Sequence, residues 1–132
     1  MAELPEKVRE AVAGKTFWSL ATVNPDGSPQ TTVVWVAPRD GRILVNTALG
    51  RRKPRNLERD PRVALAWYDP ANPYAYVQIQ GRVAESYTGE QAEADIDALA
   101  QKYLGADRYP RRANGERRIT YLIEPERVHS TL

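Results

Sequence analysis

Residues 46–61 decide how this chain is interpreted, and they read NTALGRRKPRNLERDP. An apolar run typical of a β-strand ends at Thr47, and Arg51, Arg52 and Lys53 follow closely. The proline that comes next suits the first turn of a helix, and an Asp-Pro pair ends it. Arginine forks and lysine ammonium groups bind phosphate oxygens, and the amides of a helix start add to such a site. This order of strand, cations and helix therefore predicts an anion-binding site.

Composition limits the classes of function that remain. The chain has 132 residues, of which 42% are hydrophobic and 27% charged, so we expect one domain over residues 1–132. It has no cysteine, which excludes disulfides and thiolate chemistry, and its single histidine, His129, excludes a multi-histidine metal site. We therefore predict no metal site. The sequence has neither a signal-like N-terminus nor a long apolar run, so we expect a cytoplasmic protein with no membrane partner.

Basic residues gather in two segments of the chain. Residues 51–62 hold six basic and two acidic residues, and residues 108–118 hold five and one, so each segment carries +4. The whole chain carries only +2, so the remainder is acidic. Such local positive charge favours a site for a small anion. Two alternatives are solvated loop charges and RNA binding through residues 51–62. Nucleic-acid binders are more often basic throughout, so we expect no nucleic-acid partner.

Alternating apolar residues and turn signals predict a mainly β protein. The predicted strands are Thr16–Val23, Thr31–Ala37, Ile43–Thr47, Val63–Tyr68, Tyr74–Glu85 and Ile119–Ile123. Helical spacing predicts helices near Leu4–Val12, Asn56–Asp60 and Gly89–Leu104. Because the strands are not separated by regular helices, we expect an α+β fold with a six-stranded antiparallel barrel rather than a doubly wound parallel sheet.

The common nucleotide-binding motifs are incomplete in this chain. Residues 14–16 end like a phosphate-binding P-loop, but Arg9 stands where that loop needs a glycine. No two glycines are spaced as in the dinucleotide fingerprint. Glu93 and Asp97 share one face of a predicted helix, and we interpret them as solvated rather than as a catalytic pair.

The segment at residues 46–61 resembles the flavin and deazaflavin oxidoreductases of the pyridoxamine 5′-phosphate oxidase superfamily. In that group a strand ends at a hydroxyl or amide residue, a short loop brings Arg and Lys to the cofactor phosphate, and a helix ending in Asp-Pro or Asn-Pro follows. Residues 20–30 and 76–83 resemble the first hairpin and the long central strand of the family. Residues 103–110 and 123–128 resemble C-terminal features of the branch that uses coenzyme F420.

This resemblance implies a split β-barrel homodimer with two cofactor sites at the subunit interface. It implies that reduced coenzyme F420 passes a hydride to an electron-poor small molecule, such as an enone, a quinone or a tetrapyrrole. Two alternatives are an FMN-dependent oxidase or reductase on the same fold and a non-catalytic cofactor-binding protein. The sequence offers no general acid–base constellation, so no catalytic side chain is predicted.

The resemblance also implies which residues contact the cofactor. The implied ligands of its phosphate and anionic tail are Arg51, Arg52, Lys53 and Arg55. Tyr74 and Tyr76 would reach the cofactor of the other subunit and stack there rather than donate a proton. Trp67 fits the core as well as the site. The other implied cofactor-binding residues are Gln30, Thr32, Val33, Val34, Asn46, Thr47, Ala48 and Asn56.

Overall fold

The structure, a computed structural model, describes residues 2–132, which form three helices and seven strands. In chain order these are α1 (Glu6–Ala13), β1 (Trp18–Val23), β2 (Pro29–Val34), β3 (Ala37–Arg39), β4 (Arg42–Ala48), α2 (Arg52–Arg59), β5 (Arg62–Asp69), β6 (Asn72–Thr88), α3 (Glu90–Leu104) and β7 (Arg118–Ser130). Within this range no helix has both the length and the apolar character needed to cross a membrane.

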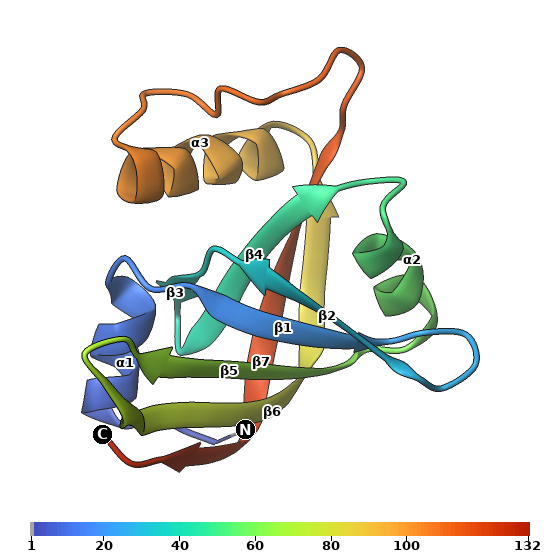
Figure 1. The fold of residues 1–132 in the computed structure, drawn as a ribbon. Helices are drawn as coiled ribbons and strands as arrows, with labels where there is room; N and C mark the ends of the chain where they lie inside the picture. The colour runs from blue at the N-terminus through green and yellow to red at the C-terminus, as the bar shows by residue number, and fades with distance from the viewer. Residues whose placement is uncertain (1) are drawn as a thin grey trace.

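All seven strands belong to one antiparallel sheet in the order β2-β1-β5-β6-β7-β4-β3. The long strands β6 and β7 pair with each other, and each also pairs with a second neighbour, β5 and β4 respectively. The sheet therefore curls, and in Figure 1 β4 and β7 cross β1 and β5 at a steep angle. Its two edge strands, β2 and β3, do not pair. The predicted α+β fold with an antiparallel split barrel is confirmed.

The number of strands differs from the six predicted. The predicted strand Thr31–Ala37 is divided, because β2 ends at Val34 and β3 begins at Ala37 and pairs with β4. Val36, between them, is fully buried, and its backbone N–H donates to the hydroxyl of Tyr103 at 3.0 Å instead of to a neighbouring strand. This side-chain bond satisfies the backbone where the chain leaves one edge of the sheet for the other.

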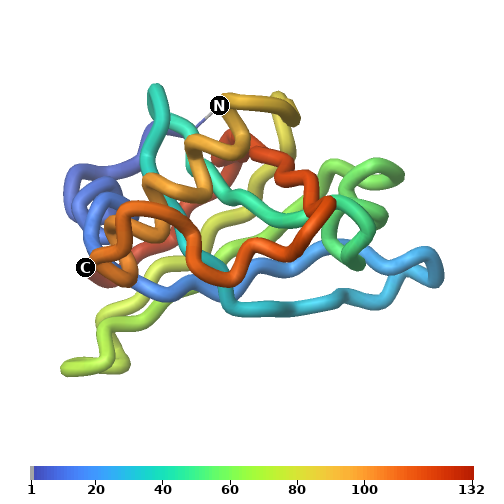
Figure 2. Tube along the Cα trace, turned by 90° about the horizontal axis from the view of Figure 1, so that it is seen from above, coloured from blue at the N-terminus to red at the C-terminus, as the bar shows by residue number. Residues whose placement is uncertain are grey.

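The long strands bend where a glycine lets two backbones approach. Gly81 in β6 lies at a register shift, and a Cβ added there would come within 2.5 Å of the carbonyl oxygen of Glu124. Only glycine fits such a close approach. Seen from above in Figure 2, the tips of the β1–β2 hairpin (light blue) and the β5–β6 hairpin (yellow-green) extend from the body in different directions.

The main core fills the inside of the curled sheet. Val8 and Val12 of α1 are fully buried at one end of it, as their helical spacing predicted, with Trp18, Ile79 and Ile123 among the strand residues that they join. A second cluster lies under α3, where Ile96, Leu99 and Tyr103 pack on Leu44 and Leu122. These two clusters hold the strand ends and α3 in fixed positions around the cavity described below.

Helix α2 begins earlier than the sequence predicted. It starts at Arg52 rather than near Pro54, so Lys53 lies in its first turn and not in a loop. The helix is anchored by Asn56, whose fully buried amide donates to the Thr22 hydroxyl at 2.9 Å and to the Asn24 side-chain oxygen at 3.1 Å. These bonds fix the middle of α2 against the first hairpin.

The interpretation of Glu93 and Asp97 as solvated was wrong. Both carboxylates bind the guanidinium of Arg112, at 3.3 Å from Glu93 and 3.2 Å from Asp97. Asp97 also accepts the backbone N–H of Tyr109 at 2.8 Å. The two acids therefore fasten the polar segment after α3 along the helix, a long-range contact that helical spacing alone does not reveal.

Candidate functional site

The end of β4 and the start of α2 border a cavity of about 160 Å³. Strand β2 and helix α3 supply further walls, and the first residue of β7 completes it. The cavity brings together six of the residues predicted to bind a cofactor: Val33, Val34, Asn46, Thr47, Arg51 and Lys53.

Three basic side chains, Arg51, Lys53 and Arg118, line this cavity. The ammonium of Lys53 is half-buried and donates to the hydroxyl of Thr32 at 3.0 Å. Burial lowers the pKa of Lys53 below its ordinary value, and the positive charges of Arg51 and Arg118 lower it further. The cavity therefore concentrates positive charge that an anion would stabilise.

Arg118 is buried and held by a chain of polar groups. Its Nε donates to the side-chain oxygen of Asn46 at 3.0 Å, and the Asn46 amide donates to the Thr120 hydroxyl, also at 3.0 Å. Thr120 in turn donates to buried Asp95 at 2.8 Å. This chain of hydrogen bonds holds Arg118 in a fixed orientation beside the cavity.

Asp95, at the end of this chain of hydrogen bonds, remains ionised. Burial opposes the ionisation of Asp95, but hydrogen bonds from Tyr87, Thr120 and other donors outweigh this effect and hold its pKa below the ordinary value.

Thr47 contributes a polar atom with no partner. Its side chain is 4% exposed, and its hydroxyl makes no hydrogen bond to residues 2–132. A buried hydroxyl without a partner carries an energetic cost, so it marks a place where a ligand atom would be favourable. Thr47 lines the same cavity as the three cations, and a threonine hydroxyl can act as a hydrogen-bond donor.

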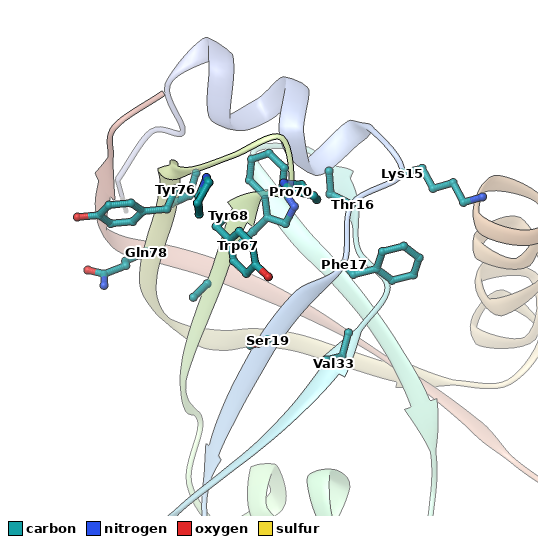
Figure 3. A pocket seen from close by; sticks show the side chains of 13 residues that line it. Lys15, Thr16, Phe17, Ser19, Val33, Trp67, Tyr68, Pro70, Tyr76 and Gln78 are labelled. Carbon is teal, nitrogen blue, oxygen red and sulfur yellow. The ribbon is translucent and has the colours of Figure 1, made fainter.

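A larger groove of about 680 Å³ adjoins this cavity at Val33, which lines both. Figure 3 shows Phe17 and Val33 on one side of the groove, and Trp67 and Tyr76 of the β5–β6 hairpin on the other. Lys15, at the rim, extends toward α3. The groove is lined mainly by apolar and aromatic side chains, and its size suits a ring system of a drug-sized ligand.

The remaining predicted site residues lie outside the small cavity. Gln30 and Arg52 line a shallow depression beside the first hairpin turn. Ala48 is buried at the end of β4, and Arg55 is exposed on α2. The Asn56 side chain is occupied by its bonds to the first hairpin. Of the remaining predicted residues, Thr32 accepts the Lys53 bond, Tyr76 lines the groove and Tyr74 is 84% exposed.

Sequence reasoning missed several lining residues. Arg118 belongs to the second basic segment, but no motif distinguished it from its neighbours. Trp35, Leu99 and Tyr109 line the cavity through the packing of α3, with the Trp35 and Tyr103 rings stacked at 5.1 Å. Phe17 was missed because the sequence showed it only as one residue of the predicted strand Thr16–Val23. The sequence held a partial signal for Arg118 alone, because it ends the second basic segment and directly precedes an apolar strand.

Histidine, aspartate and glutamate side chains form no cluster that would suggest a metal centre in the part of the chain that the structure describes. Among residues 2–132 no three such side chains come close enough together to hold a metal ion. His129 is exposed, and its Nε2 lies 3.3 Å from the hydroxyl of Tyr76.

Comparisons with known proteins agree with this fold. The sequence model of the pyridoxamine 5′-phosphate oxidase family matches residues 4–132, and the chain belongs to that family. A curated relative, the pyridoxine/pyridoxamine 5′-phosphate oxidase of Rubrobacter xylanophilus, is 35% identical over 94 residues, which cover 70% of this chain and 41% of the relative. The match therefore spans less than half of the relative's length.

Two solved structures are similar over nearly the whole chain. A structure named F420 reductase is 27% identical, covers 96% of this chain and 98% of its own, and has a TM-score of 0.83. The conserved hypothetical protein Rv2991 of Mycobacterium tuberculosis is 25% identical, covers 98% of this chain and 85% of its own, and has a TM-score of 0.77. The family and the structure named F420 reductase support a flavin- or deazaflavin-binding oxidoreductase class.

Proposed function

We propose that this chain is an F420H2-dependent reductase that transfers a hydride to an electron-poor organic acceptor. The observation that carries the proposal is the convergence of Arg51, Lys53 and Arg118 with the unpartnered hydroxyl of Thr47 in one cavity. The likeness to the structure named F420 reductase, at 27% identity over 96% of the chain, supports the deazaflavin over other cofactors of the family.

In this proposal the small cavity holds the phosphate of the cofactor. Lys53, in the first turn of α2, and Arg51, directly before that helix, donate charge-assisted hydrogen bonds to its oxygens. Arg118, the first residue of β7, is a third charged donor, and Thr47 adds a neutral donor. Lys53 and Arg118 are held by hydrogen bonds before the ligand arrives, which reduces the entropy lost on binding.

The groove beyond Val33 would receive the ring system. The bound deazaflavin supplies hydride-transfer chemistry, as the cofactor does in other enzymes of this kind. The chain's own residues orient the ring and exclude water from it: Val33 and Phe17 form one wall, and Trp67 and Tyr76 form the other. None of these side chains is required as an acid or base, so the protein contributes position and electrostatics.

The proposal includes a homodimer. Val33 is 67% exposed, Tyr68 59% and Tyr74 84%, which is unusual for large apolar side chains in a single chain. A second copy that covers this face would bury these residues and bring its Tyr74 toward the groove, as the resemblance to the family implies.

The test is to titrate the chain with F420, FMN and riboflavin in parallel and to measure binding through the fluorescence of each ligand. We expect F420 to bind more tightly than FMN, and riboflavin, which lacks a phosphate, to bind most weakly. Tighter binding of FMN would replace F420 by FMN as the cofactor. Equal binding of riboflavin and FMN would contradict the role given to the cation-lined cavity.

A further inference from the structure

One carboxylate binds two of the three cations of the cavity. The Oε1 of Glu116 lies 3.7 Å from Nη2 of Arg51, and its Oε2 lies 3.1 Å from Nη1 of Arg118. The Glu116 and Arg118 side chains are 9% and 3% exposed, so water screens this ion pair weakly, whereas the Arg51 side chain is 52% exposed and its pair is screened more. Glu116 itself does not line the cavity, whereas both of its arginine partners do.

We propose that Glu116 limits the affinity of this cavity for anions. An incoming phosphate must share or break the ion pairs that Glu116 makes with Arg51 and Arg118, and the carboxylate also repels the phosphate through space. Glu116 would thus set how strongly the cavity holds a phosphate-bearing ligand. The inference deepens the proposed function, on which it rests only in taking the cavity as a phosphate site.

A carboxylate beside an arginine can also strengthen anion binding by orienting the guanidinium group, which would oppose the proposed effect of Glu116. Arg118 is already oriented without Glu116: its Nε donates to Asn46, and its guanidinium carbon lies 5.0 Å from the ring centroid of Tyr109. Its backbone N–H donates to Glu93 at 2.9 Å. The Arg51 side chain is 52% exposed and its pair with Glu116 is 3.7 Å long, so Glu116 contributes little to its orientation. Repulsion of the anion is therefore the larger effect of Glu116.

The affected step is release of the ligand. Affinity differences between closely related complexes lie mostly in the dissociation rate. Removing the charge of Glu116 should therefore lengthen the time that a phosphate-bearing ligand stays bound, with little change in its association rate.

The test uses Glu116→Gln, which keeps the shape and one oxygen acceptor for Arg118 but removes the negative charge. Binding of inorganic phosphate is followed by NMR chemical-shift titration of the full chain at low salt. The matched control is Glu85→Gln, because Glu85 also pairs with an arginine, Arg42 at 2.9 Å, but at the other end of β4. Glu116→Ala serves as a second variant, and thermal unfolding verifies that every variant folds.

We expect Glu116→Gln to bind phosphate more tightly by about tenfold, the scale of one unit charge acting at a partly buried site. Glu85→Gln should remain within about twofold of the parent protein, as expected for a screened charge elsewhere on the surface. The gain should be smaller when Glu116→Gln is combined with Arg118→Met, because the ion pair is then already lost. Unchanged or weaker phosphate binding by both Glu116 variants, or no binding by any variant, would overturn the inference.

The same samples separate this inference from the proposed function. F420 and FMN are titrated into the parent protein and into Glu116→Gln. If phosphate binding tightens but neither cofactor binds, the inference stands and the proposed function fails. If F420 binds and phosphate affinity is indifferent to Glu116, the proposed function stands and the inference fails.

Discussion

Replacing Lys53 with methionine should separate the cost of this lysine to the fold from its benefit to binding. Methionine keeps much of the apolar stem of the side chain and removes the ammonium group. The ammonium of Lys53 is half-buried, donates to Thr32 at 3.0 Å and faces the charges of Arg51 and Arg118. A charge-assisted hydrogen bond to a ligand phosphate is worth about 1.5–3 kcal/mol. The dissociation constant of F420 should therefore rise by roughly 10- to 150-fold.

The Lys53→Met variant should lose affinity for F420 without losing folding stability. Burial first, and then Arg51 and Arg118, lower the pKa of Lys53, so its charged form disfavours the folded state at neutral pH. Removing that charge should leave the midpoint of thermal unfolding unchanged or slightly higher. A residue that merely supported the fold would give the opposite result.

The assay is a fluorescence titration with F420 at low and high salt, combined with thermal unfolding of the ligand-free protein. The loss of affinity should shrink at high salt, because mobile ions screen partly exposed charges. Lys7→Met, which removes a charge from the exposed face of α1, is the control and should bind F420 normally. Unchanged affinity in Lys53→Met would refute the reasoning and move the phosphate site elsewhere, with residues 108–118 the next candidate.

Three further predictions concern stability, chemistry and assembly. Burial lowers the pKa of Lys102 to about 8 from its ordinary value of 10.5, so between those pH values the unfolded chain holds this proton and the folded chain does not. The unfolding free energy of the parent protein relative to Lys102→Met should therefore rise across this window, and a difference that falls or stays flat in urea unfolding would contradict it. Tyr76→Phe should keep turnover within about tenfold, because general acid catalysis contributes about 100-fold or more and Tyr76 is assigned to stacking; a thousandfold loss with F420 binding intact would make Tyr76 the proton donor. Sedimentation at micromolar concentration should show a dimer, whereas a monomer alone would remove the proposed shared site.

The fold was largely predictable because its signals are local. Alternation in β1, β5 and β6, the turn after Val23 and the helical spacing of Ile96, Leu99 and Tyr103 each specify an element within a few residues. The division between β2 and β3 was not predictable, because it depends on Tyr103, 67 residues away, accepting the N–H of Val36.

The cation cluster was predictable in part for the same reason. Arg51 and Lys53 stand between a strand and a helix, and that arrangement is visible in the sequence. Arg118 reaches the cavity only because β7 pairs with β4, with Arg118 opposite Ala48 in the register. Glu93 and Asp97 were misjudged because their partner, Arg112, lies in a segment without regular structure. Contacts that depend on strand pairing, or on segments without regular structure, cannot be predicted from the spacing of nearby residues.

The proposed role of the cavity at the start of α2 is tested most directly by a crystal structure of the chain with bound F420. We predict that a phosphate oxygen lies within hydrogen-bond distance of the Lys53 ammonium and the Arg118 guanidinium, and another within reach of the Thr47 hydroxyl. We also predict that the ring system lies in the groove beyond Val33. A phosphate bound away from all three side chains would contradict the account, even if the protein proved to be a reductase.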